Sequence, residues 1–290
     1  MSQPDPGTLL DYLKRTADYF REHDIPEPRL NAERLLCGVL GLRRIDLYLQ
    51  FDRALTSDEV AKYREMIRRR AKGEPLQYIL GTTEFYGREF IVTPDVLIPR
   101  PETEVLVDAV LKRLAGVEHP VVADIGTGSG CIALTIAAER PDARVVAADI
   151  SEAALAVARR NAEKLGLASR VEFRAGDLLE PLGDLQVHAL VSNPPYVAET
   201  EREMLPREVR DWEPHVALVS GAEGLSLIHR LVEGAPRVVL PGGFAALEIG
   251  MGQADAVRAV WHAAAPTWPV EVLPDLAGID RIAIAARPAA

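Results

Sequence analysis

Short apolar runs alternate with helical segments through the second half of the chain, and this alternation is what most constrains its fold. The runs have the length of buried strands, and most of them are followed by a segment with helical periodicity. The predicted strands span 121–125, 144–150, 171–175, 185–192 and 244–249, and the predicted helices span 131–140, 152–165, 225–235 and 252–264. This alternation predicts a parallel sheet with helices on both of its faces.

The end of the chain follows a different pattern. Two further strand-like runs, 270–273 and 281–286, are separated only by residues 274–280. A parallel connection needs a crossover of a dozen or more residues, so this pair is predicted to form an antiparallel hairpin. The predicted fold class is therefore α/β: a Rossmann-like seven-stranded sheet with a C-terminal antiparallel hairpin.

The first 73 residues carry apolar side chains near a 3.6-residue period instead. Their predicted helices span 8–22, 30–40 and 57–72, and 45–49 is predicted to be a short helix or a turn. Pro26 and Pro28 are expected to break the chain between the first two helices, and Thr56 or Ser57 to cap the last one. Residues 1–73 are therefore predicted to form a small helical domain with its own apolar faces.

Between the two regions, residues 74–102 change character. The β-type residues at 78–80, 83–85 and 88–92 are separated by Gly81 and Gly87, which are turn signals. This pattern predicts a β-hairpin linker followed by a proline-rich loop. The third segment, 103–290, opens with a helix predicted to run from 103 to 114.

A glycine-rich turn, DIGTGSG at 124–130, lies between the first predicted strand of the sheet and its helix. Ligands of open parallel sheets bind at this position, and glycines let the backbone approach them closely. The predicted cofactor-binding residues of the turn are Asp124, Gly126, Thr127, Gly128, Ser129 and Gly130. Asp149 ends the next strand, where a carboxylate can accept hydrogen bonds from ribose hydroxyls.

The acids around this turn decide between two cofactor classes. A dinucleotide fingerprint needs a small residue three positions after Gly128, and Cys131 stands there instead. Asp124 would repel a pyrophosphate and attract an ammonium group. S-adenosyl-L-methionine carries an ammonium, a sulfonium and a ribose but no phosphate, so it is the predicted cofactor. The closing hairpin of the sheet also matches that of methyltransferases.

The third predicted strand ends at Asp177, which is followed by Leu178. Asp177 is a candidate acceptor for the adenine amino group, and Leu178 a candidate for packing against the adenine ring. From position alone, a simple helix-capping role for Asp177 is an equal alternative.

The fourth strand is followed by the tetrapeptide NPPY, residues 193–196. An amide or exocyclic amine nitrogen is a poor nucleophile, and such a group is best held by its hydrogens. The side-chain oxygen of Asn193 and the carbonyl of Pro194 can accept them, and both bind more strongly as the nitrogen becomes cationic. Pro195 stiffens the backbone and Tyr196 offers a face for stacking. These residues are the predicted catalytic and substrate-binding group for methyl transfer to a planar nitrogen.

The composition limits the partners of the chain. Its formal net charge is -10, whereas proteins that bind bare nucleic acid usually carry a basic face. The densest basic cluster, at 68–72, is interpreted as a solvated helix face. Cys37 and Cys131 are expected to be buried thiols, and no metal-ligand spacing is present. Neither a membrane-spanning run nor a signal-peptide pattern is found, so a cytoplasmic location is expected.

Nearly the whole chain resembles the peptide-chain-release-factor glutamine N5-methyltransferases of the HemK or PrmC type. The resemblance rests on EPLQYI at 74–79, EFYG at 84–87, VLIPRPETE at 96–104, DIGTGSG at 124–130, NPPY at 193–196 and EPHVAL at 213–218. It implies methylation of the glutamine in the Gly-Gly-Gln motif of class 1 release factors. It also implies a cofactor bound by the glycine turn, Asp149 and Asn193, and a helical domain that docks the release factor. Leu178 departs from the aromatic residue frequent in relatives.

Three alternatives remain open at this point. A sister family methylates a glutamine of a large-subunit ribosomal protein. Adenine-N6 methyltransferases of DNA or RNA share the NPPY tetrapeptide but also need a basic surface. A cofactor-binding module without catalysis is the third alternative, and the intact Asn193 argues against it.

Overall fold

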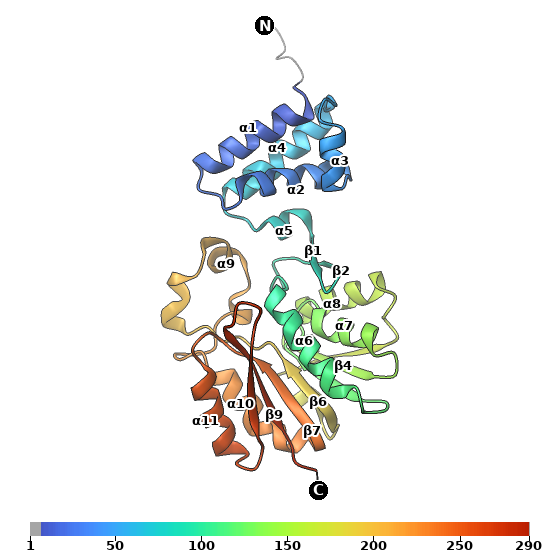
Figure 1. Ribbon diagram of the computed structural model, residues 1–290, viewed down its shortest axis with the longest axis vertical. Helices are drawn as coiled ribbons and strands as arrows, with labels where there is room; N and C mark the ends of the chain where they lie inside the picture. The colour runs from blue at the N-terminus through green and yellow to red at the C-terminus, as the bar shows by residue number, and fades with distance from the viewer. Residues whose placement is uncertain (1–6, 290) are drawn as a thin grey trace. The chain divides into compact units, whose positions relative to one another are not determined.

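The computed structural model describes residues 7–289, which form two compact units. The helical unit comprises the described residues up to Gly81 together with Arg207–Trp212 (Figure 1). The sheet unit comprises Thr82–Pro206 and the described residues from Glu213 onward. The helical unit thus extends past the boundary at 73 that the sequence indicated. The predicted absence of a signal peptide concerns a terminus of which residues 1–6 lie outside the described part of the chain.

The helical unit is built from six helices. They are α1 Leu9–Glu22, α2 Pro28–Leu40, α3 Arg44–Leu49, α4 Ser57–Ala71, α5 Leu76–Leu80 and α9 Arg207–Trp212. Thr8 and Thr56 begin α1 and α4 with capping boxes, in which Asp11 and Glu59 return the hydrogen bond to the cap residue. The predicted helices are therefore confirmed, and Thr56 is the cap of the last long one.

Two local predictions in this region were wrong. Pro28 does not break the chain but is the first residue of α2, where its fixed φ and missing N–H suit the first helical turn. Tyr78–Leu80, predicted as β-type, belong to α5, which ends at Gly81 with a left-handed φ of 78°. Tyr78 and Ile79 are buried, so packing against the helical core overrides their β propensity.

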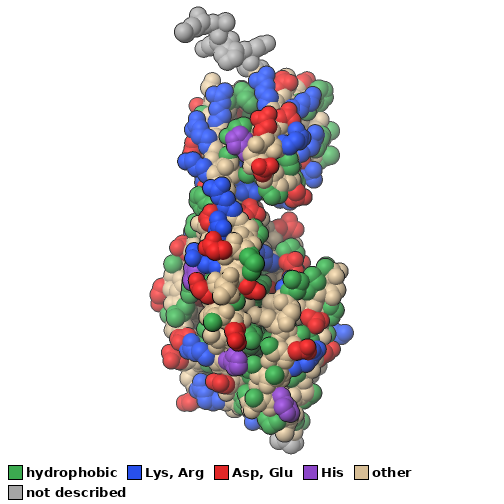
Figure 2. Space-filling view, turned by 90° about the vertical axis from the view of Figure 1, so that its left-hand side faces the viewer, with side chains coloured by type: hydrophobic (Ala, Val, Ile, Leu, Met, Phe, Trp, Pro, Cys, Tyr) green, Lys and Arg blue, Asp and Glu red, His purple; other side chains and the backbone are tan. Residues whose placement is uncertain are grey.

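The basic cluster at the end of α4 is paired rather than free. Arg68 and Arg69 bind Glu65 and Glu74, and these arginines are partly exposed as expected. Arg70 is buried, contrary to the prediction of a solvated face. It donates to Asn31 at 2.7 Å and pairs with Glu208 of α9 at 2.8 Å. In the face that Figure 2 shows, Lys and Arg side chains of this unit lie among Asp and Glu side chains.

The predicted hairpin consists of β1 Thr82–Phe85 and β2 Arg88–Ile91, which pair antiparallel. Tyr86 and Gly87 both have positive φ, as a two-residue hairpin turn requires. Asn161 binds both backbone groups of Ile91, at 2.7 and 3.0 Å, and the carbonyl of Ser129 at 2.9 Å. The hairpin is thereby tied to the glycine-rich turn and belongs to the sheet unit.

The sheet has seven strands in the order β5-β4-β3-β6-β7-β9-β8. They are β3 Val121–Ile125, β4 Arg144–Asp149, β5 Val171–Ala175, β6 Val187–Ser192, β7 Val239–Glu248, β8 Val270–Pro274 and β9 Asp280–Ala286. The first five in sequence are parallel, and β9 runs antiparallel to both β7 and β8. The predicted Rossmann-like sheet and its hairpin are confirmed; the insertion of β9 between β7 and β8 was not foreseen.

Helices cover both faces of the sheet (Figure 1). One hydrophobic cluster packs α6 Pro101–Leu114, α7 Cys131–Glu139 and α8 Glu152–Lys164 against one face. A second cluster packs α10 Ser226–Val238 and α11 Ala254–Ala264 against the other. Three short 3₁₀ turns, η1 Glu180–Leu182, η2 Glu199–Met204 and η3 His215–Ala217, lie in the connections. Within residues 7–289, no helix is both long and apolar enough to cross a membrane.

The strand order places the two sequence motifs side by side. From β3 the chain moves first to β4 and β5 on one side, and later to β6 on the other side. The register pairs Ile125, the end of β3, with Ser192, the end of β6. The glycine-rich turn and the NPPY tetrapeptide therefore leave adjacent strands at the switch point of the sheet, where open α/β sheets bind ligands.

Candidate active site

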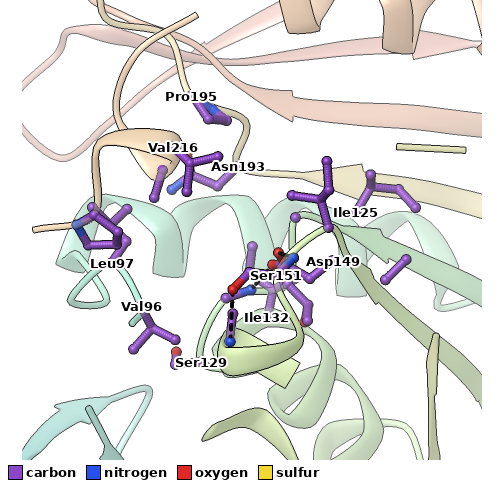
Figure 3. A pocket seen from close by; sticks show the side chains of 18 of the residues that line it. Val96, Leu97, Ile125, Ser129, Ile132, Asp149, Ser151, Asn193, Pro195 and Val216 are labelled. Atoms are coloured by element: carbon purple, nitrogen blue, oxygen red, sulfur yellow. Dashed lines mark hydrogen bonds between the residues drawn. The ribbon is translucent and has the colours of Figure 1, made fainter. Parts of the chain in front are cut away.

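A cavity of about 270 Å³ lies at this switch point, entirely within the sheet unit. One water needs only about 10–15 Å³ of such volume, so the cavity accommodates a much larger ligand. Pro195, Val216 and Asn193 lie at one end of the view in Figure 3, and Ser129 and Ile132 toward the other. The lining residues come from the turn after β3, the ends of β4 and β5, the NPPY segment, and two loops around residues 95–103 and 214–217.

The glycine-rich turn forms one wall. Gly126 and Gly128 have φ values of 70° and 54°, and a Cβ at either would meet nothing within 4 Å. Gly130 differs, because a Cβ there would lie 3.0 Å from Leu134 and 3.2 Å from Ala158. The first two glycines leave open space beside the backbone for a ligand, whereas the third permits α7 and α8 to pack closely. Thr127 and Ser129 also line the cavity.

Asp124 is not among the lining residues of the cavity, and its predicted contact with the cofactor stays a prediction. Its side chain is 0% exposed and accepts from Thr127 Oγ1 at 2.6 Å and from the Ala133 backbone N–H at 3.2 Å. Burial raises the pKa of Asp124 to about 7, and the charge of Asp149 adds to the rise. Asp124 therefore holds the turn to the first residues of α7 from behind the cavity wall.

Asp149 lines the cavity where β4 ends (Figure 3). Its carboxylate accepts from the Gly128 N–H at 2.8 Å and from the Ser151 N–H at 2.9 Å. Burial raises its pKa above the ordinary value. Each carboxylate oxygen can accept a further hydrogen bond, so Asp149 can bind a ligand while it fixes the turn.

Asp177 and Leu178 also line the cavity. The Asp177 carboxylate pairs with Arg230 of α10 at 2.5 Å, a partner that the sequence did not indicate. Leu178 has a φ of 48°, a conformation that is uncommon for a residue with a Cβ. Asp177 and Leu178, the predicted adenine contacts, therefore both line the cavity. One carboxylate oxygen of Asp177 is already bound to Arg230.

Asn193 lines the cavity at the end of β6, and its orientation is fixed from behind. Its amide nitrogen donates to Thr103 Oγ1 at 3.1 Å, and Thr103 Oγ1 donates to Glu248 Oε2 at 2.7 Å. Glu248, at the end of β7, is only 2% exposed. Burial raises the pKa of Glu248 to about 7, although its hydrogen bonds with Thr103 and Asn193 oppose the rise.

The other residues of the NPPY tetrapeptide lie in different places: one lines the cavity, and Tyr196 packs against the second hydrophobic cluster. Pro195 lines the cavity, whereas Pro194 and Tyr196 are not among its lining residues. Tyr196 packs against the second hydrophobic cluster, and its backbone carbonyl accepts from Gln253 Nε2 at 2.9 Å. Burial raises the pKa of the Tyr196 phenol to about 12, so it stays neutral. The predicted roles of the Pro194 carbonyl and the Tyr196 ring in binding substrate stay predictions.

Two loops complete the cavity. In the sequence they were noted only as motifs shared with the family that the chain resembles. Arg100 pairs with Glu213, whose other oxygen accepts from the Ile98 N–H at 3.3 Å. This contact joins the 96–104 loop to the loop that carries Pro214 and Val216, and both line the cavity. Thr103, Glu248 and the Arg100–Glu213 pair were not predicted as site residues, although three of the four lie in the quoted motifs at 96–104 and 213–218.

The charges around the cavity fit a cofactor without phosphate. Among the described lining residues, the only Lys or Arg side chains are Arg100 and Arg230, and each is paired with a carboxylate. A pyrophosphate would therefore find no unpaired cation here, whereas Asp149 can accept from hydroxyl groups. The described residues contain no group of three or more His, Cys, Asp or Glu side chains that could hold a metal ion.

Comparison with known families matches the two units separately. The PrmC N-terminal domain matches residues 11–81, and the methyltransferase small domain matches residues 101–208. The release factor glutamine methyltransferase of Geobacter sulfurreducens is 46% identical over 255 residues, which cover 88% of each chain. That of Koribacter versatilis is 45% identical over 282 residues, which cover 95% of this chain and 99% of the relative.

A solved methyltransferase from Pyrococcus furiosus shares the fold. It superposes with a TM-score of 0.53 at 18% identity, covering 70% of this chain and 91% of that chain. At this level of identity the likeness concerns the arrangement of the sheet and its helices.

Proposed function

The chain belongs to the family of release factor glutamine methyltransferases, and from this membership we propose what it methylates. It transfers a methyl group from S-adenosyl-L-methionine to the side-chain amide nitrogen, N5, of the glutamine in the Gly-Gly-Gln motif of class 1 release factors. It thereby modulates translation termination. Because this substrate takes part in translation, we further propose that the enzyme acts in the cytoplasm.

The observation that carries this proposal is the orientation of Asn193. Its amide nitrogen is engaged by Thr103, which leaves its amide oxygen available to the cavity. This oxygen accepts a hydrogen from the glutamine amide and binds it more strongly as the nitrogen gains positive charge. Such differential binding lowers the barrier of a reaction whose nucleophile cannot be deprotonated beforehand.

The cofactor occupies the wall made by the glycine-rich turn in this proposal. Gly126 and Gly128 leave room beside the backbone, and Asp149 accepts from the ribose hydroxyls. S-adenosyl-L-methionine supplies the electrophilic methyl group when bound. The residues of this chain contribute the alignment of that group with the glutamine nitrogen and the stabilisation of the charge that develops there.

A substrate panel tests the proposal against its rivals. Purified enzyme and methyl-labelled cofactor are incubated separately with release factors, ribosomal proteins, RNA and DNA, and the modified residue is located by mass spectrometry. Label on the Gly-Gly-Gln glutamine is expected. Preferred labelling of a ribosomal-protein glutamine would show that the enzyme methylates a ribosomal protein instead. Labelled adenine would contradict a protein substrate altogether.

The helical unit has a separate proposed role, the docking of the release factor. A chain that begins at Thr82 is expected to bind the cofactor normally, because all lining residues of the cavity lie after this point. Its methyl transfer to an intact release factor should fall, whereas transfer to a short Gly-Gly-Gln peptide should equal that of the full chain. Circular dichroism controls for folding, and equal turnover of the intact release factor by both chains would contradict the docking role.

A further inference from the structure

Three side chains from separate elements form a hydrogen-bonded row that leads from the cavity wall into the protein. Glu248 ends β7, Thr103 lies in the first turn of α6, and Asn193 follows β6. The Thr103 hydroxyl lies 2.7 Å from Glu248 Oε2 and 3.1 Å from the amide nitrogen of Asn193. Asn193 and Thr103 line the cavity, whereas Glu248 does not.

The chemistry of the row gives it a direction. An ionised carboxylate can only accept, so the single proton of the Thr103 hydroxyl is donated to Glu248. Thr103 is then left with acceptor lone pairs alone, and Asn193 must turn its NH₂ group toward it. The amide oxygen of Asn193 consequently faces away from the row. A neutral group at Glu248 can donate, and it would permit the reverse direction.

We propose that Glu248 and Thr103 are positioning residues that keep the amide oxygen of Asn193 directed at the substrate amide. This inference rests on the proposed function and adds to it. An Asn side chain is nearly symmetric in shape, and a flipped amide would present a donor to a substrate group that also donates. The carboxylate of Glu248 therefore selects the catalytic orientation without contacting the substrate.

The surroundings of Glu248 make its charge state sensitive to pH. The charged or titratable groups that influence it are Arg281 on β9, Glu102 on α6, Tyr196 after β6 and Cys131 on α7. Burial raises the pKa of Tyr196 and of Cys131 to about 12, so both are neutral near pH 7. Burial likewise raises the pKa of Glu248 to about 7, so the ionised form that directs Asn193 predominates above this pH.

The first test is Glu248→Gln, which keeps the shape and removes the charge. Single-turnover methyl transfer to the release factor at saturating substrates should slow roughly 10- to 100-fold, because the reacting groups are misplaced rather than removed. The wild-type rate is expected to fall as the pH drops through about 7, and this acidic limb should be absent in the variant. Binding of cofactor and of release factor should be unchanged, because Glu248 does not line the cavity.

Threonine variants provide the matched controls. Thr103→Val keeps the volume and removes the hydroxyl, and it should slow transfer as Glu248→Gln does. Thr103→Ser restores a hydroxyl and should retain most of the rate. Thr135→Val is the neutral control, since Thr135 is buried in α7 and its hydroxyl has no hydrogen-bond partner among the described residues.

A second readout does not depend on activity. Because the raised pKa of Glu248 means that its ionisation opposes folding, Glu248→Gln should raise the melting temperature at pH 8 relative to wild type. The difference should shrink at pH 5, where the native carboxyl is protonated.

The outcomes separate this inference from the proposed function. If wild type methylates the release-factor glutamine and Glu248→Gln retains the wild-type rate and pH profile, the positioning role is wrong and the function stands. If wild type methylates no release-factor glutamine, the proposed function itself is overturned.

Discussion

Glu33 in the helical unit and Glu248 in the sheet unit are both buried, and their pKa values are shifted in opposite directions. Glu33 in the helical unit is 0% exposed and receives hydrogen bonds from Arg29 at 2.9 Å and from Arg44 and Tyr48 at 2.5 Å. Burial alone would raise its pKa, but these three partners outweigh burial and hold the pKa below 4.5. Glu248 is 2% exposed, and there burial prevails and raises the pKa to about 7.

The difference lies in what surrounds each carboxylate. Glu33 has two arginines at its side, so its charge is compensated and contributes to the cohesion of the helices. Glu248 is held by the hydroxyl of Thr103, and Asp124 and Asp149 nearby in the same unit also have raised pKa values. Under-compensated acids beside a cavity are typical of sites that carry out chemistry. Glu33 therefore stabilises the helical unit, whereas Glu248, whose charge is less compensated, is available for a role beside the cavity.

Asn193→Ala should have the largest effect on the reaction of the sheet unit. Removing one preorganised group that stabilises developing charge typically lowers kcat by about 10²- to 10³-fold. Single-turnover transfer at saturating substrates measures this loss, and cofactor affinity should fall only modestly. Asn193→Asp should bind cofactor at least as well as the Ala variant and still react slowly, because its charge favours the bound sulfonium over the transition state. A near-normal rate for Asn193→Ala would show that the acceptor site lies elsewhere.

Asp149→Ala should act on binding rather than on chemistry. A charge-assisted hydrogen bond contributes about 1.5–3 kcal/mol, so the cofactor should bind roughly 10- to 150-fold more weakly in a calorimetric titration. Asp18→Ala is the matched control in the helical unit, since Asp18 is exposed and pairs with the exposed Arg21 on α1. An unchanged dissociation constant in folded Asp149→Ala would remove Asp149 from the cofactor site.

Glu33→Gln should have the smallest effect on the reaction and a clear effect on stability. Loss of the compensated charge should cost about 1–3 kcal/mol of unfolding free energy near pH 7 and leave kcat unchanged. Because the native pKa of Glu33 is lowered, its contribution is present above about pH 4.5 and is lost as the pH falls further. Chemical denaturation at pH 7 and pH 3 measures this, and an equal deficit at both pH values would contradict the compensation by the arginines.

The sequence predicted what depends on local pattern. Strand alternation located the parallel sheet, and the seven residues between the predicted runs 270–273 and 281–286 sufficed for the antiparallel hairpin. The sequence alone could not predict contacts between segments that are far apart along the chain. Thr103 and Glu248 are 145 residues apart and meet only because α6 packs beside the end of β7. The β-type residues of α5 were misassigned for the same reason, since their burial in the helical core decides their conformation.

The placement of Asp124 shows a further limit. Its position at the end of β3 is the same for a residue that faces the ligand and for one that faces α7. In the structure the side chain is fully buried, and its Oδ2 accepts from Thr127 at 2.6 Å and from the Ala133 N–H at 3.2 Å, which a sequence pattern cannot show. A period-2 pattern assigns a strand residue to one face of the sheet, but it does not specify the side chain's direction at the strand end.

The contrast between the two glutamates can be measured in one sample. Carbon-13 NMR of the side-chain carboxyl groups, assigned with Glu33→Gln and Glu248→Gln, follows both residues through a pH titration. The structure predicts that Glu33 titrates below 4.5 and Glu248 near 7. Two similar values near 4.5, or the reverse order, would contradict the claim that the charge of Glu33 is compensated and that of Glu248 is not.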